Sequence, residues 1–454
     1  MTAQRSVMWF RRDLRLSDNP ALAAAAANGA DGVLPLFVLD PALLQPSGEA
    51  RKAYLVRSLQ SLNLALEDSL QTVEGDPVDA VRQAAQSVDA VKVFVAADFG
   101  PYGSSRDTRV ERSLSDAGIE LVRVGSPYAV APGRVTKNDG TPYRVYSPFY
   151  GAWVKHGWRP PAADPAAVTW LPTALSRRLP TTPDHVECEL PEAGEPAALR
   201  RWSEFVTERL SDYAEDRNRP DIPGSSRMSV HLKYGEVHPR TLLGDLGDSP
   251  SHEVYRKELA WREFYADVLH HSPATVTEYL RPEFARMEYD TGPEAERRLH
   301  AWQQGHTGYP IVDGGMRQLL AEGWMHNRVR MVVASFLVKD LHLEWQVGAR
   351  WFMRHLVDGD LASNAHGWQW TAGCWTDASP YFRVFNPVTQ GLTFDPDGDY
   401  VRRYVPELRH LEGKGAHEPW DVREGYVHGY AKRIVDHARE RLESLARYQA
   451  IKKS

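Results

Sequence analysis

Cysteine is scarce in this sequence, and its scarcity excludes several kinds of site. Cys188 and Cys374 are the only two cysteines among 454 residues. Two thiols cannot form a multi-disulfide scaffold, a four-cysteine zinc site or a four-cysteine iron–sulfur cluster. We therefore expect neither a disulfide framework nor a metal site.

Long apolar runs and the common phosphate-binding fingerprints are missing as well. The longest apolar run in the C-terminal half, residues 331–338, is far shorter than the about 20 residues that a membrane-spanning helix needs. The N-terminus carries no signal-peptide pattern, so we expect a cytoplasmic protein that does not bind membranes. Neither G-x-G-x-x-G nor G-x-x-x-x-G-K-S/T occurs, so a bound nucleotide would not be held as NAD or ATP is held.

An excess of basic charge is also absent, because 54 Lys and Arg face 60 Asp and Glu, for a net charge of −6. This balance argues against indiscriminate nucleic-acid binding, although it permits a local basic patch on an acidic body. Aromatic residues are plentiful instead. The chain has 14 Trp, most of them in its second half.

Apolar segments and helical patterns alternate in the first part of the chain. Strands are predicted at residues 6–10, 32–39, 91–96 and 119–124, and helices at residues 20–28, 49–70, 77–87 and 104–116. Asn19 before Pro20 is a typical helix start, with a polar cap and a proline where no N–H is needed. The alternation predicts a doubly wound parallel sheet, in which ligands bind at the carboxyl ends of the strands.

The remainder of the chain changes character twice. Residues 127–196 concentrate prolines and lose periodicity, as a long connector over a surface would. Helical patterns then follow at residues 197–211, 240–246, 252–270, 294–303, 314–320, 328–341, 346–357 and 430–450. We predict an α/β doubly wound parallel-sheet domain over residues 1–126, a connector over 127–196 and an all-helical domain over 197–454.

The segment that runs from Asp358 to Trp370 is the richest in chemistry. Asp358 and Asp360 can accept hydrogen bonds from an imide-like ring edge, and Asn364 can donate or accept. Trp368 and Trp370, two residues apart, are expected to point to different sides of the backbone. The mixture favours a buried, polar heteroaromatic cofactor over the alternative, a helix end with a capping aspartate and core tryptophans.

Three other segments of the helical region carry chemistry. Residues 224–229 present a glycine and hydroxyl residues at an expected helix start, suited to an anion, although an ordinary cap is the better interpretation of this segment alone. Glu258, Trp261 and Arg262 fall on one helix face and suit a flipped nucleobase with its phosphate, or else a surface ion pair beside a core tryptophan. Residues 324–331 interleave basic and amide groups with Trp and Met, which is compatible with DNA contact.

Six segments of the chain occur together and in one order. They are residues 9–16 (WFRRDLRL), 225–229, 261–265, 307–310, 324–328 and 358–370. Together they resemble the DNA photolyase/cryptochrome family, most closely its class I cyclobutane pyrimidine dimer photolyases, over nearly the whole chain. The resemblance implies an enzyme, a deoxyribodipyrimidine photo-lyase (a carbon–carbon lyase). It would repair pyrimidine dimers in UV-damaged DNA by electron transfer from photoexcited reduced FAD to a flipped-out dimer.

The resemblance also implies a set of cofactor contacts in the helical domain. The residues that would bind FAD are Tyr213, Ser225, Ser226, Arg227, Met228, Ser229, Asp358, Gly359, Asp360 and Asn364. Asn364 would face the flavin N5 and favour the fully reduced state that repair needs. For this reason we group it with Glu258 as catalytic.

A lesion pocket and an electron path follow from the same resemblance. The residues that would contact the lesion or its DNA are Arg217, Glu258, Trp261, Arg262, Asn327, Arg328, Met331 and Trp370. Trp302, Trp345 and Trp368 would form a chain of indoles from the flavin to the surface. For any single tryptophan, core filling is the ordinary alternative.

A second, antenna chromophore is the least defined expectation. Residues 99–107 lack the acidic residue expected at this place in folate binders, so 8-hydroxy-5-deazaflavin is favoured over methenyltetrahydrofolate. The alternative is that the antenna site holds no chromophore. The partner would be UV-damaged DNA, bound by a monomer without an obligate protein partner. The alternatives are a cryptochrome-like blue-light receptor and a (6-4) photolyase, whose animal type carries histidines where this chain has Asn327 and Met331.

Overall fold

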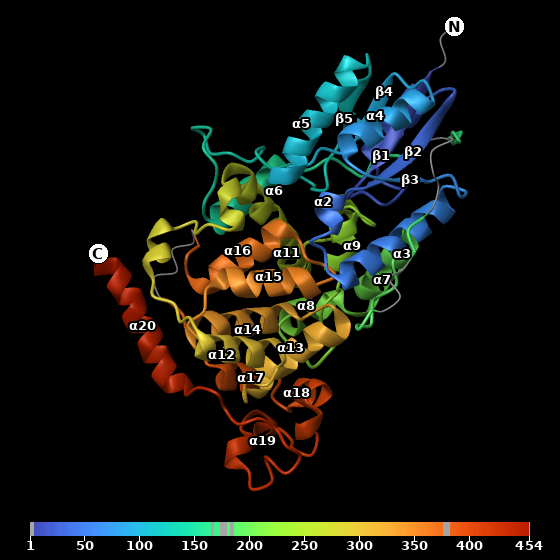
Figure 1. Ribbon diagram of the computed structural model, residues 1–454. Helices are drawn as coiled ribbons and strands as arrows, with labels where there is room; N and C mark the ends of the chain where they lie inside the picture. The colour runs from blue at the N-terminus through green and yellow to red at the C-terminus, as the bar shows by residue number, and fades with distance from the viewer. Residues whose placement is uncertain (1–3, 165–167, 173–178, 182–185, 376–381, 454) are drawn as a thin grey trace.

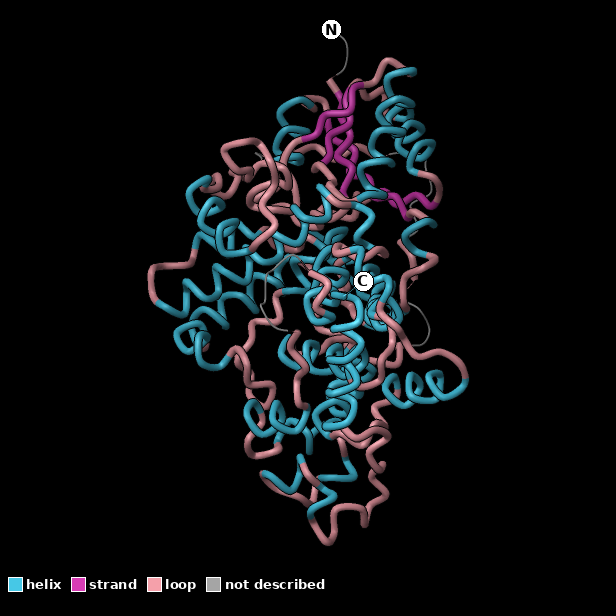
Figure 2. Tube along the Cα trace, turned by 90° about the vertical axis from the view of Figure 1, so that its left-hand side faces the viewer, coloured by secondary structure: helices cyan, strands magenta, loops and turns pink. Residues whose placement is uncertain are grey.

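A computed structural model describes residues 4–164, 168–172, 179–181, 186–375 and 382–453. Strands occur only in the N-terminal part of this described chain, and helices make up most of the rest (Figure 1). In the orthogonal view the strands gather at one end of the molecule (Figure 2). None of the described helices has the length and hydrophobicity needed to cross a bilayer.

The N-terminal sheet has five parallel strands in the order β3-β2-β1-β4-β5. The strands are β1 (Arg5–Phe10), β2 (Gly32–Leu39), β3 (Gln71–Glu74), β4 (Lys92–Val95) and β5 (Glu120–Arg123). The predicted doubly wound parallel sheet is confirmed. β3 was not predicted, because this short strand lacks an apolar run. The helix expected over 49–70 ends at Ala65 instead, and the chain turns through Glu67 and Asp68, both with positive φ.

Helices cover both faces of the sheet. They are α1 (Pro20–Asn28), α2 (Pro41–Leu44), α3 (Glu49–Ala65), α4 (Pro77–Ser87) and α5 (Pro101–Asp116). In β1, Val7 and Trp9 belong to the core shared with α4 and α5, while Met8 and Phe10 belong to the core shared with α1 and α3. Burial on both faces explains why the strands read as continuous apolar runs.

The described part of the connector is mostly irregular, but it contains a helix, α6 (Tyr146–His156), that its proline-rich composition did not reveal. The connector is anchored by Glu263, a buried residue of the helical domain. Its carboxylate accepts hydrogen bonds from the Trp153 indole (2.6 Å) and from the backbone N–H groups of Val130 (3.0 Å) and Ala129. Three donors on one carboxylate therefore fix both α6 and the start of the connector.

The helical domain confirms the predicted all-α character. Its helices are α7 (Glu195–Glu208), α8 (Tyr213–Asp216), α9 (Ser229–Tyr234), α10 (Pro239–Gly244), α11 (Pro250–His271), α12 (Pro293–Gln303), α13 (Pro310–Glu322), α14 (Asn327–Lys339), α15 (Trp345–His355), α16 (Leu361–Ala372), α17 (Pro387–Phe394), α18 (Asp399–Tyr404), α19 (Lys414–His417) and α20 (His437–Lys453). α11, α14 and α15 pack around α16, at the centre of the domain.

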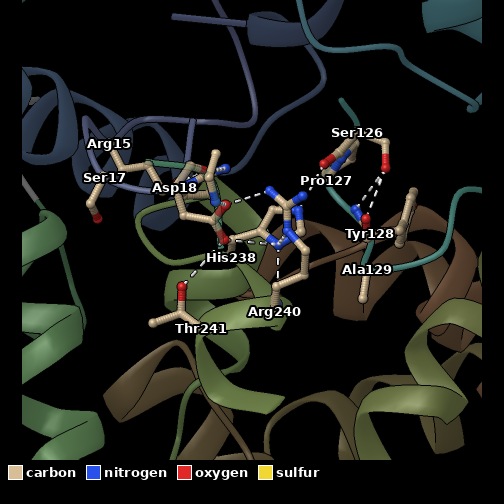
Figure 3. A network of polar contacts seen from close by, with 12 residues as sticks. Arg15, Ser17, Asp18, Ser126, Pro127, Tyr128, Ala129, His238, Arg240 and Thr241 are labelled. Carbon is tan, nitrogen blue, oxygen red and sulfur yellow. Dashed lines mark hydrogen bonds and ion pairs between the residues drawn. The ribbon is translucent and has the colours of Figure 1, made fainter. Parts of the chain in front are cut away.

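A buried polar network joins the two domains (Figure 3). Asp18, in the loop after β1, has a φ of 44° and forms an ion pair with Arg240 of α10. Arg15 donates to the Asp18 carbonyl (2.7 Å), and His238 contacts the Ser126 carbonyl (3.0 Å). Burial, followed by the charges of Arg15 and Arg240, lowers the pKa of His238 well below its usual value, so the ring is neutral. The β1 loop, the connector and α10 are thus held in one arrangement.

Replacing the anchor of the connector tests this account of the fold. Glu263→Gln introduces an amide whose N–H₂ cannot accept a hydrogen bond, and each unsatisfied buried donor costs about 1–3 kcal/mol. We expect a clear fall in melting temperature, measured by circular dichroism. The matched control is Glu296→Gln, at an exposed position of α12. An equal, small effect in both variants would contradict the anchoring role.

Candidate functional site

A cavity of about 320 Å³ lies between α9, α11, α14, α15 and α16. It brings together most of the predicted site residues, although they come from distant parts of the chain. The predicted residues that line it are Tyr213, Ser226, Met228, Ser229, Glu258, Trp261, Arg262, Asn327, Met331, Asp358, Gly359, Asp360, Asn364 and Trp368. The predicted cofactor and lesion residues therefore share one cavity.

Asp358 supplies a free acceptor at the polar end of the cavity. One carboxylate oxygen, Oδ2, accepts a hydrogen bond from Arg330 of α14 at 2.8 Å. The other, Oδ1, is buried and has no hydrogen-bond partner among the described residues. A buried carboxylate oxygen in this state is costly unless a ligand donates to it. Asp358 therefore fits a ligand that carries an N–H group at its ring edge.

Asp360 combines a structural and an electrostatic role. Its Oδ1 accepts from the Ser363 N–H (3.0 Å) and caps α16, so the helix-cap interpretation of this segment is also correct. Its Oδ2 pairs with Arg12 of the N-terminal domain at 2.9 Å. Burial raises the pKa of Asp360, but Arg12, Lys233 and Arg262 together outweigh burial and hold this pKa well below its usual range. The cavity thus contains a permanent negative charge.

Asn364 and the segment before α9 complete the cofactor end. Asn364 Nδ2 donates to the Ala349 carbonyl of α15 (3.0 Å), which fixes the side chain and leaves its oxygen available to a ligand. Ser226 Oγ lies 2.9 Å from the Tyr255 hydroxyl and also accepts from the Met228 N–H. Carboxylates, an amide, hydroxyls and an apolar wall together fit a phosphate-bearing heteroaromatic cofactor such as FAD.

Three basic residues near Asp358 and Asp360 were not predicted as site residues. They are Lys233, Arg330 and Arg12. Lys233 of α9 lines the cavity, and burial, followed by the charge of Arg12, lowers its pKa to about 8. Its spacing of four residues from Ser229 places both on one helix face, which was the available signal. Arg12 and Arg330 lie within recognised motifs, but no local pattern identifies their carboxylate partners.

The predicted lesion residues Glu258 and Trp261 line the same cavity from α11. Glu258 forms an ion pair with Arg217 at 2.8 Å. Burial raises the pKa of Glu258, and Arg217 opposes this shift only in part. The Trp261 ring stacks on Tyr146 of α6, with centroids 3.7 Å apart and an interplanar angle of 8°. α6 thereby supports one wall of the cavity.

The arginines predicted to contact phosphate differ in their surroundings. Arg328 donates to Asn218 (2.8 Å) and lies over the Phe394 ring, and both it and Arg217 remain partly exposed. Arg262 instead donates to two backbone carbonyls, those of Pro127 (2.9 Å) and Leu232 (3.2 Å). The structure therefore places Arg262 in the domain junction, with its donors engaged.

Three further predicted residues lie outside the lining of the main cavity. Arg227 pairs with Glu322 (2.9 Å), and its guanidinium lies over Trp324. Ser225 does not line the cavity either, and Trp370 lines a separate cavity of about 50 Å³. Trp368 and Trp370 thus face different cavities, as their spacing on a helix requires.

The three predicted electron carriers are all buried. Trp302 and Trp345 are 0% exposed and Trp368 is 2% exposed. Trp302 and Trp368 have ring centroids 6.1 Å apart. Within the described residues, no cluster of three or more His, Cys, Asp or Glu is suited to a metal ion.

The predicted antenna segment begins α5. Arg106 forms ion pairs with Asp107 (2.9 Å) and Asp98 (3.2 Å), and its guanidinium lies over Trp9 of β1. The Trp9 indole nitrogen and Asp107 Oδ2 are buried without a hydrogen-bond partner among the described residues. These groups lie on or next to the strands and helix that form the carboxyl edge of the sheet.

Comparison with known proteins agrees with this geometry. A family model described as DNA photolyase matches residues 6–167, and one described as the FAD binding domain of DNA photolyase matches residues 255–450. A deoxyribodipyrimidine photo-lyase of Agrobacterium fabrum is 38% identical, with 99% of this chain and 98% of the relative covered.

Two solved structures share the fold. A bacterial class III photolyase from Agrobacterium tumefaciens has a TM-score of 0.92 at 37% identity, covering 100% of this chain and 99% of the other. A cryptochrome from Synechocystis sp. PCC6803 has a TM-score of 0.89 at 26% identity, covering 98% and 99%. Because the first is described as class III, the resemblance to class I stays a prediction. The chain belongs to the DNA photolyase/cryptochrome family and carries that family's FAD-binding domain.

Proposed function

We propose that this protein is a deoxyribodipyrimidine photo-lyase that repairs cyclobutane pyrimidine dimers in UV-damaged DNA. One observation carries the proposal: Glu258 and Trp261 line the same cavity as Asp358, Asp360 and Asn364. A lesion and a flavin bound by these residues would share one cavity. FAD held by these residues would supply, in its reduced and photoexcited form, the electron needed to split the dimer.

The chain's own residues orient the cofactor. The free Oδ1 of Asp358 would accept a hydrogen bond from an N–H at the ring edge, while Arg330 holds the other oxygen. Asp360 stays ionised beside Arg12, and Asn364 is held in place by the Ala349 carbonyl. These groups are positioned before the cofactor binds, so little reorganisation is needed.

The lesion end distinguishes a dimer from normal bases. Trp261 presents a flat apolar wall, and Glu258 is available to a base edge once it shares or releases Arg217. Arg217 and Arg328 are partly exposed and suited to phosphate oxygens. A dimer is already poorly stacked, so flipping it out costs less than flipping a normal pair.

The alternative functions are a cryptochrome-like light receptor and a (6-4) photolyase. Because a cryptochrome shares the fold, only individual residues can distinguish these functions from dimer repair. Asn327 and Met331 line the cavity where the animal type of (6-4) enzyme would carry histidines. Together with Glu258 and Trp261, they favour repair of cyclobutane dimers over a signalling role.

A second chromophore would bind the N-terminal domain, and we favour 8-hydroxy-5-deazaflavin over methenyltetrahydrofolate. Trp9 offers a buried ring with a free indole N–H, Arg11 and Arg106 lie over that ring, and Asp107 offers a free oxygen. This support is chemical and does not depend on the FAD site. The protein would bind damaged DNA as a monomer.

The role of Glu258 can be tested by removing its charge. We expect Glu258→Gln to retain FAD but to repair several-fold fewer dimers per absorbed photon. The neutral amide no longer pairs with Arg217, which holds this side chain where it would hydrogen-bond to a base edge of the dimer. Repair of oligothymidine dimers under blue light measures this yield. Glu253→Gln, on the same helix, is the matched control, and an unchanged yield for Glu258→Gln would remove this residue from the mechanism.

Salt dependence tests the phosphate contacts. Arg328→Gln should weaken binding to dimer-containing DNA and reduce the slope of log K against log salt by about 1, because one fewer counterion is released. Fluorescence anisotropy over a range of salt concentrations measures both quantities. Arg441→Gln, at an exposed position of α20, should leave the slope unchanged. A wild-type slope in Arg328→Gln would contradict the contact.

A further inference from the structure

The three indoles do not by themselves lead out of the protein. Trp368 lines the cavity, but Trp302 and Trp345 are 0% exposed. An electron that enters the cavity from solvent therefore needs a further carrier that is both oxidisable and accessible. That carrier has to contact one of the two inner indoles.

Trp345 is the neighbour of Trp368 along α15. A Cβ built on Gly348 would lie 2.1 Å from the Trp368 ring, so this ring rests directly against the helix backbone. Trp345 lies three residues before Gly348, on the same helix face. Trp302 lies beside Trp368 and Phe352 instead, and its indole donates to the Val333 carbonyl (3.0 Å), so it forms a buried branch.

A tyrosine continues the path from Trp345. The Tyr279 ring meets the Trp345 ring edge-on, with centroids 6.2 Å apart and an interplanar angle of 84°. Tyr279 and Tyr289 both pack against the core that contains the indoles, yet both are partly exposed. They are thus placed between the buried rings and solvent.

One backbone and one side-chain hydrogen bond hold the two tyrosine segments close to the start of α15. The Asp290 N–H, next to Tyr289, donates to the His342 carbonyl at 2.9 Å. Gln346 Nε2 donates to the Thr277 carbonyl, near Tyr279, at 3.2 Å. Neither segment is a loose loop, and the arrangement of the rings is defined.

We propose that Tyr279 is the electron donor that reduces oxidised Trp345. Tyr279 loses one electron to the Trp345 radical cation, and its O–H proton passes to solvent water. Trp345 returns to its neutral form. A thiolate in solution later returns one electron to the partly exposed Tyr279 ring, which regains a proton from water.

The surroundings of the indoles favour this direction. The indole nitrogens of Trp345 and Trp368 are buried and have no hydrogen-bond partner among the described residues. An oxidised indole without a proton acceptor keeps its N–H proton, so it remains a strong oxidant. A phenol that can lose a proton together with the electron is easier to oxidise than one that cannot.

The surroundings of Tyr279 keep its hydroxyl protonated before the electron leaves. Its hydroxyl is buried and lacks a partner of ordinary hydrogen-bond geometry among the described residues. Burial raises its pKa to about 12, the nearby hydroxyl of Tyr289 and amide of Gln346 lower this pKa in part, and Glu344 raises it. Tyr279 is therefore a neutral phenol at neutral pH, and it has to lose its proton when it loses the electron.

Flash spectroscopy tests the inference, which rests on the proposed function because it needs an oxidant in the cavity. Protein with bound, oxidised FAD is excited without added thiol. The tryptophan radical cation and the neutral tyrosyl radical are then followed by transient absorption and electron paramagnetic resonance. In the wild type we expect a tyrosyl radical to appear as the tryptophan signal decays, more slowly in D₂O.

The variants decide between the tyrosines. Tyr279→Phe should lose the tyrosyl signal and prolong the tryptophan radical. Tyr289→Phe should retain the tyrosyl signal and its slower formation in D₂O, because Tyr279 is the residue that is oxidised. Tyr448→Phe, a ring of the same core that stacks on Phe382 at 4.4 Å, is the control and should behave as the wild type. A full tyrosyl signal in Tyr279→Phe, or a wild-type decay of its tryptophan radical, would overturn the proposal.

A second assay separates the two proposals. Dimer repair by chemically reduced wild-type protein needs no electron from Tyr279, so it tests the proposed function alone. Absent repair beside an intact tyrosyl signal would contradict the proposed function. Normal repair beside an absent tyrosyl signal in the wild type would contradict the electron path.

Discussion

The ion pair between Arg12 and Asp360 is the contact on which most of the site depends. It joins the loop after β1 to the first turn of α16, across the domain boundary, at 2.9 Å. The same carboxylate caps α16, which carries Asn364 and Trp368 into the cavity. Because a buried charge without a partner is strongly destabilising, Arg12 determines whether this helix can begin where it does.

The junction around this pair contains several other polar contacts between the domains and the connector. Asp18 and Arg240 fasten the β1 loop to α10, and Glu263 fastens the connector to α11. Arg262 belongs to the same junction, since it donates to Pro127 and Leu232. Such networks specify one arrangement more strongly than apolar packing does, because a shifted domain would leave charges unpaired.

Much of the fold was predictable because its signals are local. The strand–helix alternation and the Asn19 cap correctly predicted a parallel sheet with helices between its strands. Helical periodicity correctly predicted that the second domain is all-helical. β3, α6 and α16 were missed for different reasons. β3 is short and polar, α6 lies among prolines, and α16 combines Ala, Asn, Gly and Trp in a pattern without clear amphipathicity.

The sequence motifs identified residues most of which line one cavity, but they did not predict the direction of each side chain. Arg227 and Trp370 belong to recognised segments, yet they line other cavities. Lys233 faces the main cavity without belonging to any predicted set. These differences arise from tertiary contacts, such as Arg227 with Glu322 and Trp324, that no spacing along the chain encodes.

The glycine at position 348 affects how fast an electron can tunnel between Trp345 and Trp368. Its missing side chain lets the Trp368 ring rest on the backbone of α15, one helical turn from Trp345. The rate of electron tunnelling falls steeply as the donor and acceptor rings move apart. The absence of a side chain at this one position therefore sets the rate between Trp368 and Trp345. A methyl group at this position would push α15 and α16 apart and lengthen the tunnelling distance. Electron transfer would then slow, although no redox-active atom had been changed.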